Sequence, residues 1–522
     1  MFLFETSPIL KHISSKIDAT NKLVIPGGID THTHCQMPFM GTKAVDDFYI
    51  GTKAGLVGGT TMIIDFVIPQ KGESLVAAYK QWREWADAKV CCDYALHMAV
   101  THWDDNVRQE MKQMVGEEFG INSFKVFMAY KDVIMLEDNE IIECFKVNCS
   151  AVQLLMRMYF EWKPKILYYC LGPEGHPLSR PEEVEEEATM RACLIAGQTK
   201  CPLYIVHVMG KSAANIILQK RKDGIVIFGE PIAASLAVDG SHYYHTCWKH
   251  AAAYVLSPPL REDVTTPNYL MELLARGDLD CTGTDNCTFS SAQKAAGIND
   301  FTKIPNGVNG LEDRMSVIWE KGVASGLMTP ERFVAVTSTT AAKIFNIYPK
   351  KGVIAPGSDA DIVIWNPNQT RTISAETHHH AVDFNIFEGM EVHGVAEWVL
   401  TGGRIVVEEG QLKMAKGAGK FVPTPPFSPY VYDRVRLTEE EQARKWVPVF
   451  RSEEDMYVDM NSGPTPPAED GNTSTNVHDS SFSLEQHASP RVNEEKERKP
   501  AIDSKPQIRV RNPPGGKSSI FF

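Results

Sequence analysis

Several features are missing from this chain, and each absence narrows the classes of protein to which it can belong. No stretch approaches the roughly 20 uncharged apolar residues of a membrane-spanning helix. The start, Met1-Phe-Leu-Phe-Glu5, lacks the basic region and long apolar run of a secretory signal. Positive charge is in deficit, since 53 Lys and Arg face 66 Asp and Glu. We therefore expect no membrane span and no nucleic-acid partner for the globular part.

The cysteines also lack a pattern. There are 11 of them, an odd number, and their spacing matches no disulfide framework. Reduced thiols and a cytoplasmic protein are the simplest interpretation. The length of 522 residues exceeds one average domain, and the 43% hydrophobic content supports a sizeable core.

Strand and helix patterns alternate over most of the chain, which is typical of a parallel sheet. The predicted strands are short apolar runs at residues 24–34, 62–68, 94–100, 123–130, 203–208 and 225–228, with a weaker one at 279–285. The predicted helices span residues 48–56, 74–86, 107–115 and 181–196. At this length the alternation favours a (β/α)8 TIM-like barrel, which we place at residues 26–348.

The pattern changes after the barrel. Short strands separated by Gly turns predict that residues 349–436 form a small β-sandwich, to which residues 1–25 contribute a truncated N-terminal segment. Residues 437–522 are rich in Pro, Ser, Glu, Asn and Lys, so we expect a disordered tail. Its basic end, residues 498–517, is either a solvated charge run or a docking segment for a protein partner.

The stretch Asp30-Thr-His32-Thr-His34 is the strongest candidate for a functional site in the sequence. On a strand, residues i and i+2 point to the same face, so His32 and His34 project side by side and can chelate one metal ion. The alternative is a hydrogen-bonded pair of core histidines. By the same reasoning, His378-His-His380 is either a metal tract or a solvated loop, and we expect the loop.

Three further ionisable residues interrupt or end apolar strands: Lys125, His207 and Asp285. Catalytic groups of a (β/α)8 barrel lie at the carboxyl ends of its strands. Each residue taken alone could be a satisfied core polar group. Together with the histidine pair, four strand ends that all carry metal-ligand types favour a shared metal centre.

Many long stretches of the chain resemble the motifs of one known protein family. They are Asp30-Thr-His-Thr-His34, Gly58-Gly-Thr-Thr-Met-Ile-Ile-Asp65, Asn122-Ser-Phe-Lys-Val-Phe-Met-Ala-Tyr-Lys131, Gly172-Pro-Glu-Gly-His176, Tyr204-Ile-Val-His-Val-Met209, Gly229-Glu-Pro-Ile-Ala233, Thr282-Gly-Thr-Asp-Asn-Cys287, Ile304-Pro-Asn-Gly-Val-Asn-Gly310 and Gly357-Ser-Asp-Ala-Asp361. The chain resembles the dihydropyrimidinase/hydantoinase family of the amidohydrolase superfamily. It is also similar to that family's non-catalytic relatives, the collapsin response mediator proteins.

The resemblance implies two Zn²⁺ ions per subunit. His32, His34 and Asp285 would bind one ion and His207 the other, and Lys125, carboxylated on N6, would bridge them. A hydroxide between the ions would be the nucleophile, and Asp285 would carry its proton to the leaving nitrogen.

The resemblance also implies the substrate side of the site. Tyr130 would stabilise the oxyanion, and the backbone at Ser257 and Asn306 would hold a cyclic amide. Related dihydroorotases place an Arg where this chain has Gln36, and no cation stands nearby in the sequence. A neutral ring such as 5,6-dihydrouracil or a hydantoin therefore fits better than a carboxylate. Family analogy further implies a homotetramer.

The chain departs from the family in one segment. The family carries another metal-ligand His at the end of strand five, which by spacing falls close to Met158, but this chain has no His from residue 103 to 175. Residues 149–170 resemble nothing in the family, and our hypothesis is a frameshifted or mis-spliced stretch. His176 belongs to a separate family motif and is not expected to replace the missing ligand.

Two functions follow from the resemblance. The first is a dihydropyrimidinase, which hydrolyses dihydropyrimidines to N-carbamoyl-β-amino acids. The second is a non-catalytic scaffold that acts through cytoskeletal partners. The scaffold relatives lose the histidine pair and the strand-eight Asp, whereas this chain keeps both; its tail end, residues 509–519, nevertheless resembles scaffold tails. The retained residues favour the enzyme.

Overall fold

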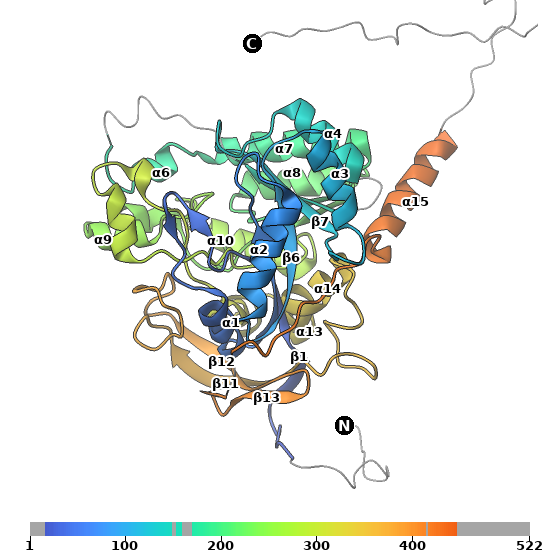
Figure 1. The fold of residues 1–522 in the computed structure, drawn as a ribbon. Helices are drawn as coiled ribbons and strands as arrows, with labels where there is room; N and C mark the ends of the chain where they lie inside the picture. The colour runs from blue at the N-terminus through green and yellow to red at the C-terminus, as the bar shows by residue number, and fades with distance from the viewer. Residues whose placement is uncertain (1–15, 149–152, 159–169, 414–415, 446–522) are drawn as a thin grey trace, which may run out of the picture. The chain divides into compact units, whose positions relative to one another are not determined.

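A parallel sheet forms the centre of the molecule, as the alternating pattern predicts (Figure 1). The computed structural model describes residues 16–148, 153–158, 170–413 and 416–445. The sheet has seven strands in the order β10-β9-β8-β7-β6-β5-β2. Their bounds are β2 Gly28–Thr33, β5 Thr60–Val67, β6 Asp93–Val100, β7 Ser123–Met128, β8 Gln153–Met158, β9 Leu203–Ile205 and β10 Ile227–Gly229.

The segment after Asp280 closes this sheet into a barrel. It makes parallel bridges to both edges, Ile232 to Gly283 and Thr33 to Asn286. The amide of His34 donates to the Asn286 carbonyl at 2.9 Å. The predicted strand at residues 279–285 therefore occupies the eighth position. It forms isolated bridges instead of a regular strand because Asp285 has a left-handed φ of 52°, which interrupts extended backbone.

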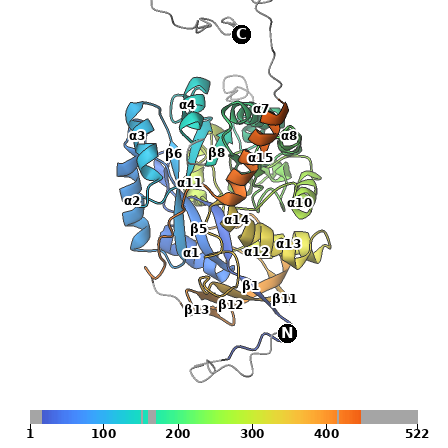
Figure 2. The same ribbon diagram turned by 90° about the vertical axis from the view of Figure 1, so that its right-hand side faces the viewer.

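Helices cover the outside of the barrel (Figure 2). The main ones are α1 Phe48–Val57, α2 Leu75–Asp87, α3 Asp105–Met114, α4 Asp138–Asn148, α7 Glu182–Thr199, α8 Lys211–Lys222, α10 Thr266–Arg276 and α15 Pro429–Lys445. The side chains of Asp47, Ser74 and Asp104 accept the N-terminal amides of α1, α2 and α3, which explains where these helices begin. The four predicted helices are confirmed within a few residues.

Short elements fill the connections. The helical ones are α6 Gly175–Leu178, η2 Gly240–Tyr244, α9 Trp248–Ala253, α11 Ser291–Lys294, η3 Ala295–Gly297, η4 Phe301–Lys303, α12 Arg314–Ile318, η5 Trp319–Ala324, α13 Pro330–Val334, η6 Ala335–Thr339 and α14 Thr340–Ile344. A small hairpin pairs β3 Pro38–Phe39 with β4 Thr42–Lys43. Within the described residues, no helix has both the length and the apolar character needed to cross a membrane.

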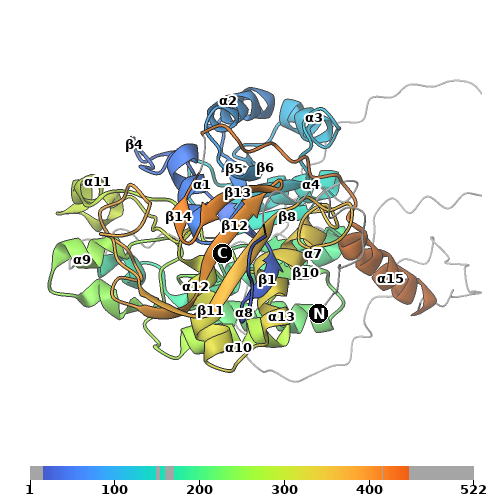
Figure 3. The ribbon, with the colours of Figure 1, turned by 90° about the horizontal axis from the view of Figure 1, so that it is seen from below.

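A second, antiparallel sheet packs below the barrel, where the sequence predicts a β-sandwich (Figure 3). Its order is β1-β11-β12-β13-β14, with bounds β1 Leu23–Pro26, β11 Ile362–Thr372, β12 Glu391–Thr401, β13 Arg404–Glu408 and β14 Gln411–Leu412. Of the predicted sandwich, the described residues form this one sheet. The chain passes from β1 into β2 at Gly27, where a Cβ would lie 1.9 Å from Oγ1 of Thr61. Only glycine fits that crossing.

The sheet is joined to the barrel by a buried lysine. Nζ of Lys351 lies 2.6 Å from Asp93, 3.0 Å from Asp359 and 2.5 Å from Asp361. Burial lowers the pKa of Lys351, but the carboxylates of Asp361 and Asp93 outweigh it and the net shift is upward. The three aspartates therefore have a cation of the chain itself between them.

The expectation of a solvated histidine loop at His378–His380 is wrong. His380 is buried, and its Nδ1 lies 2.6 Å from the Asp46 carboxylate. Burial lowers the pKa of His380, but Asp46 outweighs this and raises it to about 9. A charged partner 334 residues earlier makes the burial tolerable, and sequence spacing gives no sign of it.

Candidate active site

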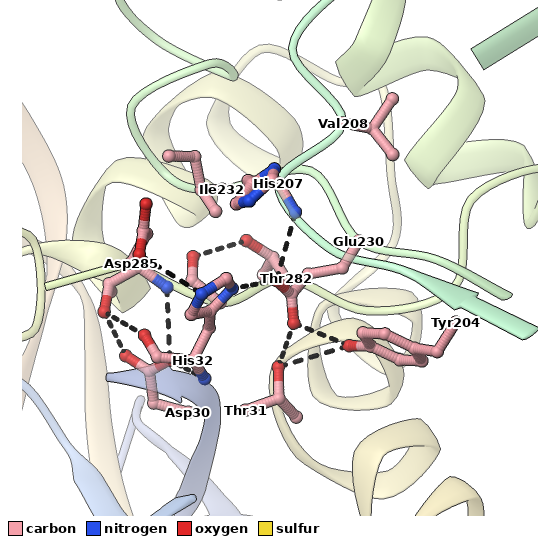
Figure 4. Close-up of polar contacts among 12 residues, drawn as sticks. Asp30, Thr31, His32, Tyr204, His207, Val208, Glu230, Ile232, Thr282 and Asp285 are labelled. Atoms are coloured by element: carbon pink, nitrogen blue, oxygen red, sulfur yellow. Dashed lines mark hydrogen bonds and ion pairs between the residues drawn. The ribbon is translucent and has the colours of Figure 1, made fainter. Parts of the chain in front are cut away.

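The predicted histidine pair meets Asp285 at the carboxyl end of the barrel strands. Figure 4 shows His32 beside Asp285. Nε2 of His32 and Nε2 of His34 each lie 3.1 Å from Oδ1 of Asp285. All three side chains are buried. Two imidazoles and one carboxylate at this spacing form a donor set that suits a divalent metal ion.

Asp30 holds the two parts of this cluster together. Its Oδ1 accepts the amides of His32 and Thr284, both at 3.1 Å, and its Oδ2 accepts the Thr284 hydroxyl at 2.7 Å. Burial raises the pKa of Asp30, and the charge of Arg314 opposes that shift. Strand β2 and the segment that ends in Asp285 are therefore aligned by one carboxylate.

Lys125 and His207 flank the cluster. Lys125 projects from β7, and its Nζ lies 3.3 Å from Nε2 of His32 and 3.9 Å from the centroid of the Phe66 ring. His207 follows β9 with a left-handed φ of 39°, and its ring lies 5.4 Å from that of His32. Non-glycine residues in this conformation concentrate at functional sites.

Glu230 is a member of the site that the sequence reasoning missed. Its carboxylate lies 2.8 Å from Nδ1 of His32 and accepts the Tyr204 hydroxyl at 2.6 Å and the His207 amide at 3.4 Å. It also accepts the Thr31 hydroxyl (Figure 4). The signal was present, because Glu230 follows the end of β10 at Gly229, just as His207 follows the end of β9. Carboxylates of this kind orient metal-binding histidines.

The electrostatics differ between the two histidines. Burial lowers the pKa of His34 to about 3, so its ring is neutral. Burial and Lys125 lower the pKa of His32, but Asp285 and Glu230 outweigh them and the net shift is upward. Neutral imidazole is the form that binds metal, and Nδ1 of His34 is buried with no hydrogen-bond partner among the described residues. These donors fit a metal ion.

The place of the family's strand-five histidine lies at the end of β8. Met158 pairs with Met128 in the register of β8 and β7. The side chains of β8, and residues 149–152 and 159–169, lie outside the described residues, so the frameshift hypothesis stays untested. His176 is not available as a replacement, since its Nε2 lies 2.6 Å from the Leu256 carbonyl oxygen.

The predicted substrate residues lie on neighbouring loops. Tyr130 follows β7 with a φ of 62°. The cavity of about 510 Å³ that it lines lies beside α4 and α7, and its lining includes no predicted metal ligand and neither Ser257 nor Asn306. Ser257 and Asn306 lie on two segments joined by the Gly307 amide, which donates to the Val255 carbonyl at 2.9 Å. Lys294 fixes the same segments, as its buried Nζ donates to Val255 at 2.9 Å and to Pro305 at 3.1 Å.

The expectation that no cation stands near Gln36 is wrong. Gln36 does have a cation beside it, because Nζ of Lys89 donates to its Oε1 at 2.5 Å. That cation is already paired with Asp47 at 2.9 Å. Its charge is therefore compensated within the chain, and the residue that supplies it lies 53 positions from Gln36.

The fold and the site define a metal-dependent amidohydrolase. A model of the amidohydrolase family matches residues 23–406, and the chain belongs to this family.

Within this family, the chain is similar to dihydropyrimidinases and to a dihydropyrimidinase-related protein. A dihydropyrimidinase from Rattus norvegicus is 58% identical over 444 residues, which cover 84% of this chain and 85% of that protein. Dihydropyrimidinase-related protein 5 from Homo sapiens is 45% identical and covers 96% of this chain and 91% of its own length. The crystal structure of dihydropyrimidinase from Brevibacillus agri is 41% identical with a TM-score of 0.75, over 79% of this chain and 90% of that one.

Proposed function

We propose that this chain is a metal-dependent dihydropyrimidinase, which opens the ring of 5,6-dihydrouracil or dihydrothymine to give an N-carbamoyl-β-amino acid. The observation that carries the proposal is the convergence of His32, His34 and Asp285 within 3.1 Å contacts, with Lys125 3.3 Å from His32. Relatives named dihydropyrimidinase at 55–60% identity support the reaction.

We infer that the barrel centre holds two zinc ions. His32, His34 and Asp285 would hold one ion and His207 the other, with Lys125 between them as a carbamate. Lys125 is fully buried between the His32 imidazole and the Phe66 ring, where an ammonium group is costly. Carboxylation on N6 would replace that cation with an oxygen ligand. Such ions lower the pKa of a bound water and so provide a nucleophile at neutral pH.

The chain's own residues would handle the substrate and the protons. Asp285, beside both histidines, accepts the proton of the attacking water and gives it to the leaving nitrogen. The Tyr130 hydroxyl donates to the developing oxyanion. The backbone at Ser257 and Asn306, held by Lys294, fixes the cyclic amide.

Ring opening of 5,6-dihydrouracil by the purified protein, with zinc and bicarbonate supplied, tests the proposal. We expect turnover in the wild type and in the exposed control Asp223→Ala, and its loss by at least about 10³-fold in Asp285→Ala. Absence of turnover, followed by its appearance when a His-Ala-Glu-Asn-Gly segment replaces the residues around Met158, would show that the missing histidine limits this chain. Absence from both proteins contradicts the proposal.

A scaffold function remains the second candidate, supported by one observation. The match to dihydropyrimidinase-related protein 5 runs over 524 aligned positions, whereas the match to the rat dihydropyrimidinase runs over 444. The longer match extends the similarity beyond the region that the enzyme covers. If Asp285→Ala and the wild type are equally inactive with and without the graft, this candidate is favoured. The family analogy to a homotetramer is tested by light scattering.

A further inference from the structure

Four metal-ligand side chains lie within nine consecutive residues outside the barrel centre. They follow the pattern His242-x₂-His245-x-Cys247-x₂-His250, on η2, α9 and the turn between them (Figure 1). None belongs to a stretch that carries the family resemblance. His242 and His250 are partly buried, and His245 and Cys247 are exposed.

Two of the four ligand atoms already face each other. Nδ1 of His242 lies 2.9 Å from Nε2 of His250, and the ring centroids are 5.2 Å apart. Tyr254 stacks on His242 at 4.0 Å with an interplanar angle of 1°, and its ring lies 4.9 Å from that of His250. The aromatic ring on α9's final turn therefore holds both imidazoles with their nitrogens facing each other.

His245 lies beside this pair, and Cys247 follows it two residues later. The ring of His245 lies 4.1 Å from that of His250, and its Nδ1 accepts the Cys247 amide at 3.0 Å. Both side chains are exposed, so each can change rotamer with little repacking. Moving His245 costs one exposed hydrogen bond, which water can replace.

We propose that His242, His245, Cys247 and His250 form a second metal site, which binds Zn²⁺ or a similar borderline divalent ion. Three imidazoles and one thiolate are the donors of tetrahedral zinc sites, and hard ions such as Mg²⁺ and Ca²⁺ prefer oxygen. In the metal-free protein a proton between the two facing nitrogens takes the ion's place.

Cobalt binding separates this site from the barrel centre. The five predicted barrel ligands include no cysteine, so a thiolate-to-cobalt charge-transfer band reports ligation by a thiol such as Cys247. We expect the band when metal-free full-length protein is titrated with Co²⁺, and we expect Cys247→Ser to abolish it. His250→Ala should weaken the Co²⁺ affinity by at least about tenfold. The control His393→Ala, at a half-exposed histidine elsewhere, should leave both unchanged.

The outcomes also distinguish this site from the proposed catalytic one. Asp285→Ala removes a barrel ligand and should keep the band at full intensity. A band that survives in Cys247→Ser, that disappears in Asp285→Ala, or that never forms in the wild type overturns the proposal. Turnover plays no part in this test, so failure of the dihydropyrimidinase assignment leaves it decisive.

Discussion

Two histidine clusters of this molecule are built in opposite ways. The barrel centre draws His32, His34, Lys125, His207 and Asp285 from strand ends spread over nearly half of the chain, and buries all of them. The η2–α9 cluster draws its four donors from nine consecutive residues and leaves two of them exposed. The first is fixed by the fold, whereas the second is fixed by local backbone and one stacked tyrosine.

The two clusters differ in the groups that hydrogen-bond to their histidines. At the barrel centre, Glu230 and Asp30 set the direction of His32 and tie its strand to the Asp285 segment. Among the described residues around the η2–α9 cluster, no carboxylate hydrogen bond to His242, His245 or His250 is seen, and two side chains must move to complete a ligand set. A preorganised centre suits catalysis, and a site assembled on binding suits a loosely held ion.

Of the changes considered, altering the carboxylate that orients His32 should have the largest effect on metal binding and turnover. Glu230→Gln keeps the size of the side chain but removes the charge that faces Nδ1 of His32. We expect zinc affinity and turnover to fall by about 10- to 100-fold, because the imidazole loses its orientation and basicity. Metal content after dialysis and initial rates measure this. The control Glu262→Gln, an exposed glutamate, should match the wild type; equal metal content in both variants would show that Glu230 is not an orienting group.

Glu230 also illustrates which parts of the site can be predicted from the sequence and which cannot. The i, i+2 rule placed His32 and His34 together, and barrel geometry placed Asp285 with them, since both rules are local or topological. Glu230 ends a strand in the same way and went unrecognised, because its role depends on which residues face it. The Lys89–Gln36 and His380–Asp46 contacts were missed for the same reason, as their partners are 53 and 334 residues apart.

His380 provides an intermediate case, a buried histidine whose partner is one carboxylate. Its pKa is about 9 in the folded state against about 6.5 unfolded. A raised pKa means that the stabilisation is complete below about pH 6.5 and is lost as the pH rises through about 9. We expect the unfolding free energy of the wild type relative to His380→Gln to shrink by about 3 kcal/mol over this window.

Urea unfolding at a series of pH values measures that difference. Taking the difference between the two proteins removes the contribution of Lys294, whose pKa burial lowers to about 7 and which titrates in the same range. His393→Gln is the matched control, because His393 pairs with Glu320 at a half-exposed site. A difference that stays constant from pH 6 to pH 10 would contradict a charged His380.

A smaller effect is expected on the substrate side of the barrel centre. Lys294→Met keeps the length of the side chain but removes the donors to Val255 and Pro305. The segments that carry Ser257 and Asn306 would shift, while the metal ligands stay in place. We expect KM for dihydrouracil to rise by about fivefold with a smaller change in kcat.

The exposed control Lys303→Met should leave both constants unchanged. If kcat falls in Lys294→Met at constant KM, then Lys294 does not position the substrate segments. A loss of thermal stability without a change in either constant would give it a purely structural part.

The smallest effect belongs to the η2–α9 cluster. His250→Ala removes one of its two preformed ligand atoms, yet α9 leads directly into Val255 and Ser257 through the stacked Tyr254. Because Lys294 and His176 hold the carbonyls of Val255 and Leu256 independently, we expect turnover to change by less than about twofold. Rates measured with and without added zinc test this. If His250→Ala loses turnover, and if added zinc also lowers turnover in the wild type, then the two clusters are coupled through this helix. The contrast between a catalytic centre and an independent site would then fail.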